Sequence, residues 1–476
     1  MAMPDESSET SGQAGISRRT FLRIGGAAVG SLLVACGGAA PATPAAEAPA
    51  ASTAAAAAAT AAPAAATAAA PAAATAVVPA VNTGAKQTVR YLSWWFEEGN
   101  RGKTWNAFIK EFNDSHKDIE IKAENIPFDA YTTKTIVAAQ SGKLDGDILQ
   151  ATPELAPRLI KADLLFPLDD VLVRNNITDL SSAHDAMRKD GHLYGLDMVT
   201  VAFGILYNKK RYDDAKITPA KTPEEWVEVS KALTNRDKQQ YGLWANHLVN
   251  EASDFWFQLE EWAMPYGGLW AKGKTPLLTS DPIIKGLKLF KQMYDVAFPQ
   301  GADGATGQRL FGTGAIAQGL YVSAAVGGLK PLFPDLYPQL RSAPIPWASN
   351  TSIARIHPMM INKASDVKDA ALEFVTYMYK PDNYRRMVEG CEDVIFSMPS
   401  AADPAYREKL QWLKPGYDGV KYVTPFDVVG DFIYNFQEFG QIVITNFANV
   451  LNAGKSVEDA MAQAQKEAEA LAARIK

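Results

Sequence analysis

The sequence has only two cysteines, Cys36 and Cys391, and no long run of apolar residues. Its most apolar N-terminal stretch, residues 24–35, consists of apolar and small residues and contains several glycines and alanines. A helix that spans a membrane needs about 18–20 apolar residues, so this stretch is too short to span one. A charged segment, a short apolar run and small residues in that order are instead typical of an export signal.

The sequence also lacks basic clusters, metal-site spacings and catalytic motifs. Its formal net charge is −6, and residues 1–36 do not alter this value because their three acids and three arginines cancel. A mildly acidic chain without basic clusters argues against nucleic acid and anionic membranes as partners. The five histidines are scattered, and no G-x-S-x-G motif occurs. We therefore expect no metal, no cofactor and no enzymatic activity.

One motif match is misleading. Residues 268–275, GLWAKGKT, fit the phosphate-binding pattern G-x-x-x-x-G-K-[ST]. A functional loop of this kind follows a strand and opens a helix, whereas here a helix-like stretch precedes it and Pro276 follows at once. We expect no nucleotide site there.

Two signal patterns occur at the N-terminus. Residues 17–23, SRRTFLR, resemble a twin-arginine export signal with Arg18 and Arg19 as its arginine pair. Residues 33–36, LVAC, resemble the lipobox of lipoproteins, in which the cysteine becomes the first mature residue and carries lipid. Acyl chains at Cys36 hold such a protein on the outer face of the cytoplasmic membrane, extracellular or periplasmic. Cys391 is then alone, and we expect it to be a small buried hydrophobe. The alternative is an uncleaved apolar segment with a chance cysteine.

The chain divides into three segments by composition. Residues 1–36 form the signal, and residues 37–86 are almost entirely Ala, Pro, Thr and Gly with no aromatic residue, which predicts a disordered tether. Residues 87–476 have an ordinary composition and contain all ten tryptophans. Because this segment is longer than one hydrophobic core usually grows, we expect two lobes.

Strand and helix periods alternate at the start of the globular segment. Residues 88–95 are rich in β-formers, and Trp105, Phe108, Ile109 and Phe112 share one helix face. Residues 119–123 alternate with period two, and a second helix (131–141) and the apolar run 146–151 follow. This order predicts parallel β-α-β units and an α/β fold. Further helices are expected at 222–233, with Thr222 as N-cap and Glu225 in capping-box register, and at 456–475.

A series of short patterns resembles the extracellular solute-binding proteins of ABC importers, in the large group that binds carbohydrates. These patterns lie, in the family's order, at residues 141–150 (SGKLDGDILQ), 190–215 (DGHLYGLDMVTVAFGILYNKKRYDDA), 221–226 (KTPEEW), 310–323 (LFGTGAIAQGLYVS) and 361–378. The sequence departs from the family at Gly146 and Asp197, where proline is usual.

This resemblance implies a two-lobed periplasmic-binding-protein-like fold of type II, with a ligand cleft between the lobes. The solute closes the hinge by touching both lobes, and a membrane permease then receives it from the closed protein. We expect a monomer whose partners are a small-molecule solute, the ABC permease and, through Cys36 alone, the lipid bilayer.

Position along the chain suggests which side chains contact a sugar. A sugar needs hydrogen-bond partners at its edge and flat apolar surface under its face. Two adjacent tryptophans on a strand cannot both point inward, so we expect one of Trp94 and Trp95 to be exposed toward the cleft. Most aromatic residues of an α/β domain lie in its core, which is the competing interpretation for each ring. The candidate ligand residues are Trp94, Trp95, Glu97, Glu98, Gln150, Thr152, His247, Trp262, Tyr321, Trp347, Met398 and Ser400.

Two other functions remain open from the sequence. The same fold can bind a polyamine, a polyol phosphate or a peptide. The acid pairs Glu97–Glu98 and Glu260–Glu261 are also compatible with an exported glycan-acting enzyme. Adjacent acids usually mark a solvated surface, so we expect neither pair to be catalytic.

Overall fold

The computed structural model describes residues 86–323, 325–347, 349–392, 395–410, 412 and 421–475. The described residues belong to one compact unit, Ala80–Lys476. The predicted signal with Arg18, Arg19 and Cys36 lies outside the described residues, as does the tether up to its last residue. Within the described ranges, no helix combines the length and apolar character that a membrane crossing requires.

The first lobe is built around one sheet. Its elements are β1 (Gln87–Ser93), η1 (Trp95–Glu97), α2 (Gly99–Ser115), β2 (Ile119–Asn125), α3 (Phe128–Ser141), β3 (Ile148–Gln150), α4 (Ala156–Lys161), β4 (Leu165–Phe166), α5 (Asp169–Asn175), η2 (Ser182–Met187), β5 (Arg188–Lys189), β6 (His192–Leu193), β7 (Leu196–Val201), β15 (Arg355–Asn362), α12 (Lys368–Met378), α13 (Pro381–Cys391), η7 (Pro399–Ala401) and α14 (Pro404–Lys409). The strand order is β2-β1-β3-β15-β4, and β7 also pairs with β15. Strands β2, β1 and β3 are parallel, and β15 is antiparallel to its neighbours.

The second lobe has a four-stranded sheet of order β13-β8-β12-β9. Its elements are β8 (Phe203–Asn208), α6 (Lys209–Ala215), α7 (Pro223–Ala232), η3 (Arg236–Lys238), β9 (Tyr241–Trp244), η4 (Val249–Glu251), α8 (Ala252–Leu259), η5 (Glu260–Tyr266), β10 (Ala271–Lys272), β11 (Thr275–Pro276), α9 (Asp281–Ala297), α10 (Gly304–Gly312), β12 (Ile316–Val322), α11 (Ala325–Leu332), η6 (Tyr337–Gln339), β13 (Leu340–Ala343), β14 (Thr351–Ile353), β16 (Lys421–Val423), α16 (Pro425–Val429), η8 (Gly430–Asn435), α17 (Phe436–Ala453) and α18 (Val457–Ala472).

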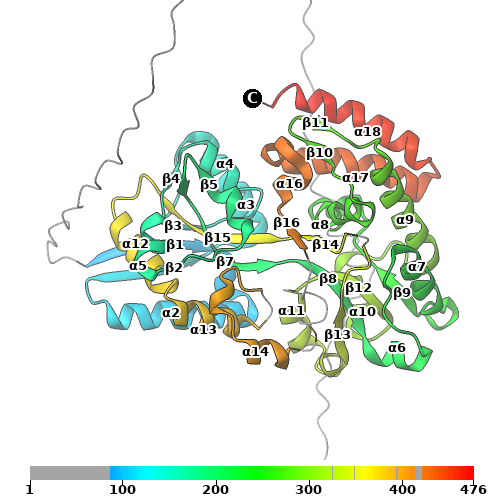
Figure 1. Ribbon diagram of the computed structural model, residues 1–476, viewed down its shortest axis with the longest axis horizontal. Coiled ribbons are helices and arrows are strands. Elements are labelled where there is room, and N and C mark those ends of the chain that lie inside the picture. Colours follow the sequence, from blue (N-terminus) through cyan, green and yellow to red (C-terminus); the bar gives the residue numbers. More distant parts are fainter. Residues whose placement is uncertain are drawn as a thin grey trace, which may run out of the picture. The chain divides into compact units, whose positions relative to one another are not determined.

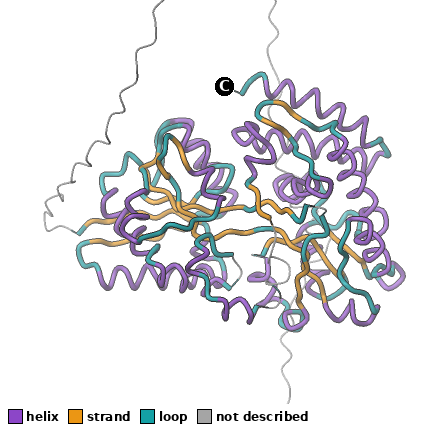
Figure 2. The backbone as a smooth tube through the Cα atoms, in the orientation of Figure 1, coloured by secondary structure: helices purple, strands orange, loops and turns teal. Residues whose placement is uncertain are grey.

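The chain passes between the lobes several times. Strand β7 of the first sheet continues into β8 of the second after the single residue Ala202, and β14 continues into β15 after Ala354. A third passage leads from α13 and η7 back to β16 of the second lobe. Figure 1 shows these strands running across the middle of the picture, and Figure 2 shows helices flanking the strands on both sides.

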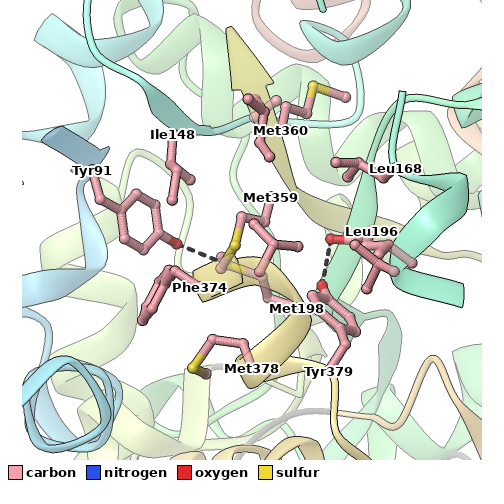
Figure 3. Close-up of a cluster of buried hydrophobic side chains, with 14 of the residues drawn as sticks. Tyr91, Ile148, Leu168, Leu196, Met198, Met359, Met360, Phe374, Met378 and Tyr379 are labelled. Carbon is pink, nitrogen blue, oxygen red and sulfur yellow. Dashed lines mark hydrogen bonds between the residues drawn. The ribbon is translucent and has the colours of Figure 1, made fainter. Parts of the chain in front are cut away.

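Each lobe has its own hydrophobic core. In the first lobe, the crossing strand β7 is held in the core by two tyrosines (Figure 3). The Tyr91 hydroxyl donates to the sulfur of Met198 at 3.0 Å, and the Tyr379 hydroxyl donates to the Leu196 carbonyl at 2.5 Å. Burying a large apolar side chain contributes about 1.5–3 kcal/mol, so these rings fix β7 to the first sheet.

A buried aromatic cluster and a buried glutamine organise the second lobe. Trp226 and Trp262 stack with 5.5 Å between ring centroids, and Trp347 meets both rings edge-on. The side-chain oxygen of Gln318, on β12, accepts from the Trp226 indole and from the Tyr212 hydroxyl, both at 2.8 Å. Because a buried amide without partners is costly, these bonds fix the position of β12.

Most of the predicted elements are present. The helix face of Trp105, Phe108, Ile109 and Phe112 is buried in α2, and β1 and β2 are parallel as predicted. The phosphate-loop-like stretch forms the β10–β11 hairpin, so it opens no helix. Thr222 caps α7, but Glu225 accepts from the backbone N–H of Lys221 rather than from that of Thr222, so the predicted capping box is wrong.

We predict that Gly286→Ala destabilises the second lobe. A Cβ at this helical position of α9 would stand 1.9 Å from the backbone carbonyl oxygen of Trp262, so α9 and η5 would have to separate. Overpacking of this kind costs about 1–3 kcal/mol, which thermal unfolding followed by circular dichroism measures as a lower Tm. Gly304→Ala in α10 is the control, since its Cβ would meet nothing closer than 3.4 Å. Equal Tm values for the two variants would contradict this packing.

Candidate functional site

The crossing strands are anchored by a buried group of charges. Arg355, the first residue of β15, forms ion pairs with Glu260 and Glu261, and all three side chains are at most 1 % exposed. Glu261 also accepts from the backbone N–H of Ile353 at 3.0 Å, and Ser352 donates to Glu261 and to the Phe203 carbonyl at the start of β8. Glu261 therefore contacts the end of β14 directly and the start of β8 through Ser352.

This group holds more negative than positive charge. Burial raises the pKa of Glu260 and of Glu261, and the Arg355 guanidinium offsets only part of that effect. Glu154 of the first lobe interacts electrostatically with Arg355 and raises the pKa of Glu260 further, while Arg158 interacts with Glu154. Two buried carboxylates that share one guanidinium retain a proton more readily than exposed carboxylates do.

The end of β1 turns sharply to present polar side chains to the second lobe. The strand stops at Ser93, whose hydroxyl accepts from the Trp95 backbone N–H at 3.0 Å, and the short η1 turn follows. Gly102 lets α2 approach η1, because a Cβ there would stand 2.5 Å from the Phe96 carbonyl oxygen. This close approach places the first turn of α2, with Asn100 and Arg101, directly after the strand end.

A cavity of about 490 Å³ lies between this turn and the second lobe. The first lobe contributes Glu98, Gly99, Asn100 and Arg101, and the second lobe contributes Gln308 of α10, Tyr321 of β12 and five residues of α11: Ala325, Gly327, Leu329, Pro331 and Leu332. Ligand pockets commonly have volumes of about 300–1,000 Å³, so this cavity accommodates a small molecule. One wall is charged and polar, and the wall made by α11 is mainly apolar.

The charged side chains of the cavity wall are paired with each other. Arg101 donates to Glu98 at 2.8 Å, and its guanidinium lies 5.3 Å from the ring centroid of Trp95. Burial raises the pKa of Glu98, although Arg101 opposes that shift. The Trp95 ring therefore supports Arg101 from behind, and Arg101 holds Glu98 in place.

An ion pair joins the two lobes beside the cavity. Lys330 of α11 donates to Glu392, which follows α13, at 2.8 Å, and Asn100 donates to the same carboxylate oxygen at 3.2 Å. Both charged side chains are 40 % exposed, so the pair is worth about 1 kcal/mol or less. It nevertheless marks where the lobes meet on this side of the crossing strands.

Two of the sequence-predicted residues lie on the cavity wall, Glu98 and Tyr321. Trp95 lies behind Arg101. The expectation that one of Trp94 and Trp95 is exposed is wrong, since the side chains are 5 % and 1 % exposed. The alternation rule does not apply, because β1 ends before either residue.

The other predicted residues are dispersed over both lobes. Gln150 is buried at the end of β3, where its oxygen accepts from Ser93, and Thr152 is buried just beyond it. His247 is buried with both ring nitrogens on backbone groups of its own lobe, namely the Ala245 carbonyl and the Gly301 N–H. The remaining placements are Glu97, exposed on η1; Trp262 and Trp347, in the tryptophan cluster; Met398, in the core of the first lobe; and Ser400, bonded to Asp179.

Sequence reasoning missed three polar residues of the wall, Asn100, Arg101 and Gln308. A usable signal for the first two was present, since polar residues directly after a buried first strand of an α/β lobe lie at a ligand-binding edge. The expectation that Glu260–Glu261 is a solvated pair is wrong, because Arg355 draws both carboxylates into the interior.

The described residues of the cavity wall can supply hydrogen bonds and apolar contact to a small molecule. The wall provides a carboxylate, a guanidinium, two amides and a tyrosine ring whose hydroxyl is buried, opposite aliphatic side chains. Among the described residues, no group of three or more His, Cys, Asp or Glu side chains is placed to hold a metal ion. This combination suits reversible binding of a polar molecule that also has an apolar face.

We predict that the buried charge group makes stability fall as the pH rises. The pKa of Glu260 is about 8 in the folded chain against an ordinary value of 4.5, so the stabilisation is complete below pH 4.5 and is lost as the pH rises through about 8. The Tm then falls by roughly 5 °C between pH 6 and pH 9, and Glu260→Gln removes most of this slope. Scanning calorimetry measures it, with the exposed Glu228→Gln of α7 as control. An unchanged slope in Glu260→Gln would contradict the assignment.

Comparison with known proteins gives a match to one family model and to one curated relative. Residues 97–385 match the model of the family described as bacterial extracellular solute-binding protein. A relative in Escherichia coli (strain K12), the putative ABC transporter periplasmic-binding protein YcjN, is 21 % identical over 367 residues, which cover 74 % of this chain and 82 % of the relative.

Two solved structures show the same fold. The GacH receptor of Streptomyces glaucescens, studied unliganded and with acarbose, is 20 % identical with a TM-score of 0.69, and the match covers 82 % of this chain and all of that one. A solute-binding protein from Thermotoga lettingae bound to alpha-D-tagatose is 18 % identical with a TM-score of 0.68, with the same coverage of both chains. The match to the family model covers more than half of the chain, which therefore belongs to the bacterial extracellular solute-binding proteins.

Proposed function

We propose that this chain captures a sugar or oligosaccharide in the cavity between its lobes and delivers it to the permease of an ABC importer. The observation that carries the proposal is the composition of the cavity wall. Side chains of the first lobe (Glu98, Asn100, Arg101) offer hydrogen-bond partners for hydroxyl groups, and α11 offers aliphatic surface for the C–H face of a sugar ring. The sugars bound by the GacH receptor and the Thermotoga lettingae protein support the same class of ligand.

Binding in this site requires both lobes. The cavity has one wall from each lobe, so a bound solute contacts both walls only when the lobes are close together. A ligand shifts a conformational equilibrium by its difference in affinity for the two states, which here favours the closed arrangement. We take the two crossings between the lobes as the hinge. Strand β7 passes into β8 through Ala202 alone, and β14 passes into β15 through Ala354 alone.

The cellular setting is also part of the proposal. Arg18 and Arg19 direct export, Cys36 carries the lipid, and residues 37–86 let the folded part reach away from the membrane surface. The protein acts as a monomer that binds rather than transforms its ligand. Of the residues predicted from the sequence, we propose Glu98 and Tyr321 as direct ligand contacts, and Trp95 as the support of Arg101.

We predict that a sugar stabilises the protein against heat. A ligand at about 100 times its Kd adds about 2.7 kcal/mol to the free energy of unfolding. The measurement is thermal unfolding of the purified chain with a panel of mono-, di- and oligosaccharides and sugar alcohols, together with spermidine, glycerol 3-phosphate and short peptides. A shift confined to the non-sugars would discard the carbohydrate assignment, and depletion of an oligosaccharide without a shift would indicate an enzyme.

We predict that Arg101→Ala weakens binding of the sugar found in this panel by about 10-fold or more, since a hydrogen bond to a charged group is worth about 1.5–3 kcal/mol. Isothermal titration calorimetry measures the Kd. The control is Arg174→Ala, which removes an arginine of an exposed ion pair on the same lobe. Equal affinities for the two variants would place the ligand outside this cavity.

A further inference from the structure

We infer that a second site, which takes a phosphate group, lies where α4 of the first lobe meets η8 and the residues after α18 of the second lobe. A pocket of about 320 Å³ there is lined by residues of both lobes. In Figure 1, α4 lies above the strands that cross between the lobes and α11 lies below them, so this pocket is separate from the cavity at Glu98. The site is independent of the proposed sugar-binding function.

The pocket has an excess of positive charge. Arg158 and Lys161 of α4 and Arg474 after α18 line it, and its other described lining residues carry no charge. Arg158 and Lys161 are three positions apart, so they share one face of α4, where like charges repel each other. Cationic side chains that converge from two lobes without an acidic residue in the lining favour an anionic ligand.

Arg158 is the least compensated of the three cations. Its side chain is half-buried, and its Nε atom is buried without a hydrogen-bond partner among the described residues. Burial lowers the pKa of Arg158, and the Glu154 carboxylate, which also interacts with Arg355, offsets only part of that effect. Buried donors in native proteins are almost always paired, so this guanidinium points to an acceptor from outside the chain.

The other two cations are placed to share the same ligand. The Lys161 ammonium lies 4.1 Å from the ring centroid of Tyr434, a contact between the two lobes. Arg474 pairs with Glu438, but its side chain is 64 % exposed, so this pair is weak and Arg474 can turn to a ligand. None of the acids that act on these residues is among the described lining residues; they are Glu154, Asp431 and Glu438. A phosphate held by all three cations would also hold the lobes together.

The donors favour a phosphate group over a carboxylate. Two guanidinium groups and one ammonium group can approach three oxygens, and a phosphomonoester has three terminal oxygens and about two negative charges, whereas a carboxylate has two oxygens and one charge. Tyr434 also lines a neighbouring cavity of about 430 Å³, whose wall includes the rings of Tyr422 and Phe426. The organic part of a phosphomonoester can lie against these rings.

The test titrates the full chain with inorganic phosphate by isothermal titration calorimetry, at constant ionic strength because salt screens exposed charges. We expect Arg158→Gln to weaken phosphate binding about 10-fold, since it removes a charged hydrogen-bond donor. Arg158→Lys keeps the charge without the planar fork and should recover part of the affinity. Arg474→Gln changes an exposed side chain, which guards against a folding defect, and should weaken binding about 3-fold. Arg174→Gln, in an exposed ion pair of the first lobe, is the matched control and should leave phosphate binding unchanged.

Three outcomes would overturn the inference. The first is phosphate binding no tighter than acetate binding, or none at millimolar concentration. The second is equal phosphate affinity in the wild type, Arg158→Gln and Arg474→Gln. The third is a loss of phosphate binding in Arg101→Ala but not in Arg158→Gln, which would place the anion at the first turn of α2. Sugar binding is measured separately, so none of these results decides the proposed function.

A phosphomonoester can come from a soluble molecule or from a lipid headgroup, and two further measurements distinguish these sources. Phenyl phosphate should bind more tightly than inorganic phosphate if a soluble ester places its ring against Tyr422 and Phe426. Cosedimentation with phosphatidylcholine vesicles that contain phosphatidic acid, seen for the wild type and lost in Arg158→Gln, would assign the headgroup. Either result supports the site.

Discussion

The architecture depends on one buried interaction, the pairing of Arg355 with Glu260 and Glu261. A single buried guanidinium between two acidic side chains is a poor source of stability, because the desolvation of the charged groups offsets much of their attraction. Its role is to fix the positions of the strands that cross between the lobes. Glu261 bonds to the backbone beside the β14–β15 crossing, and Ser352 links it to β8, so the strands that cross between the lobes share one fixed point.

The cavity follows from this arrangement and from two close approaches. The crossing strands bring the end of β1 opposite β12, Gly102 allows α2 to close on η1, and Gln318 fixes β12 from within its own lobe. Polar side chains then line one wall and aliphatic ones the other. The lining residues belong to segments more than 200 positions apart in the sequence, such as Glu98 and Gln308, and only the fold brings them together.

Local patterns predicted the elements well and the site only in part. The period of Trp105, Phe108 and Ile109 identified α2, because helix periodicity is a property of neighbours in the sequence. The burial of Glu260 and Glu261 could not be read in this way, since it depends on an arginine about 95 positions later whose location only the folded chain defines. Arg101 follows the buried first strand, which was a usable signal in the sequence, but its contacts with Trp95 behind it and its place opposite α11 are defined only by the folded chain.

The contact between Arg101 and Trp95 also bears on the fluorescence of the protein. An indole ring is fluorescent, and its emission responds to a charge placed above its face. Trp95 lies beneath the one guanidinium of the described cavity wall, whereas Trp226, Trp262 and Trp347 are enclosed in the core of the second lobe. The fluorescence of Trp95 is therefore expected to change if a solute displaces Arg101 from its ring.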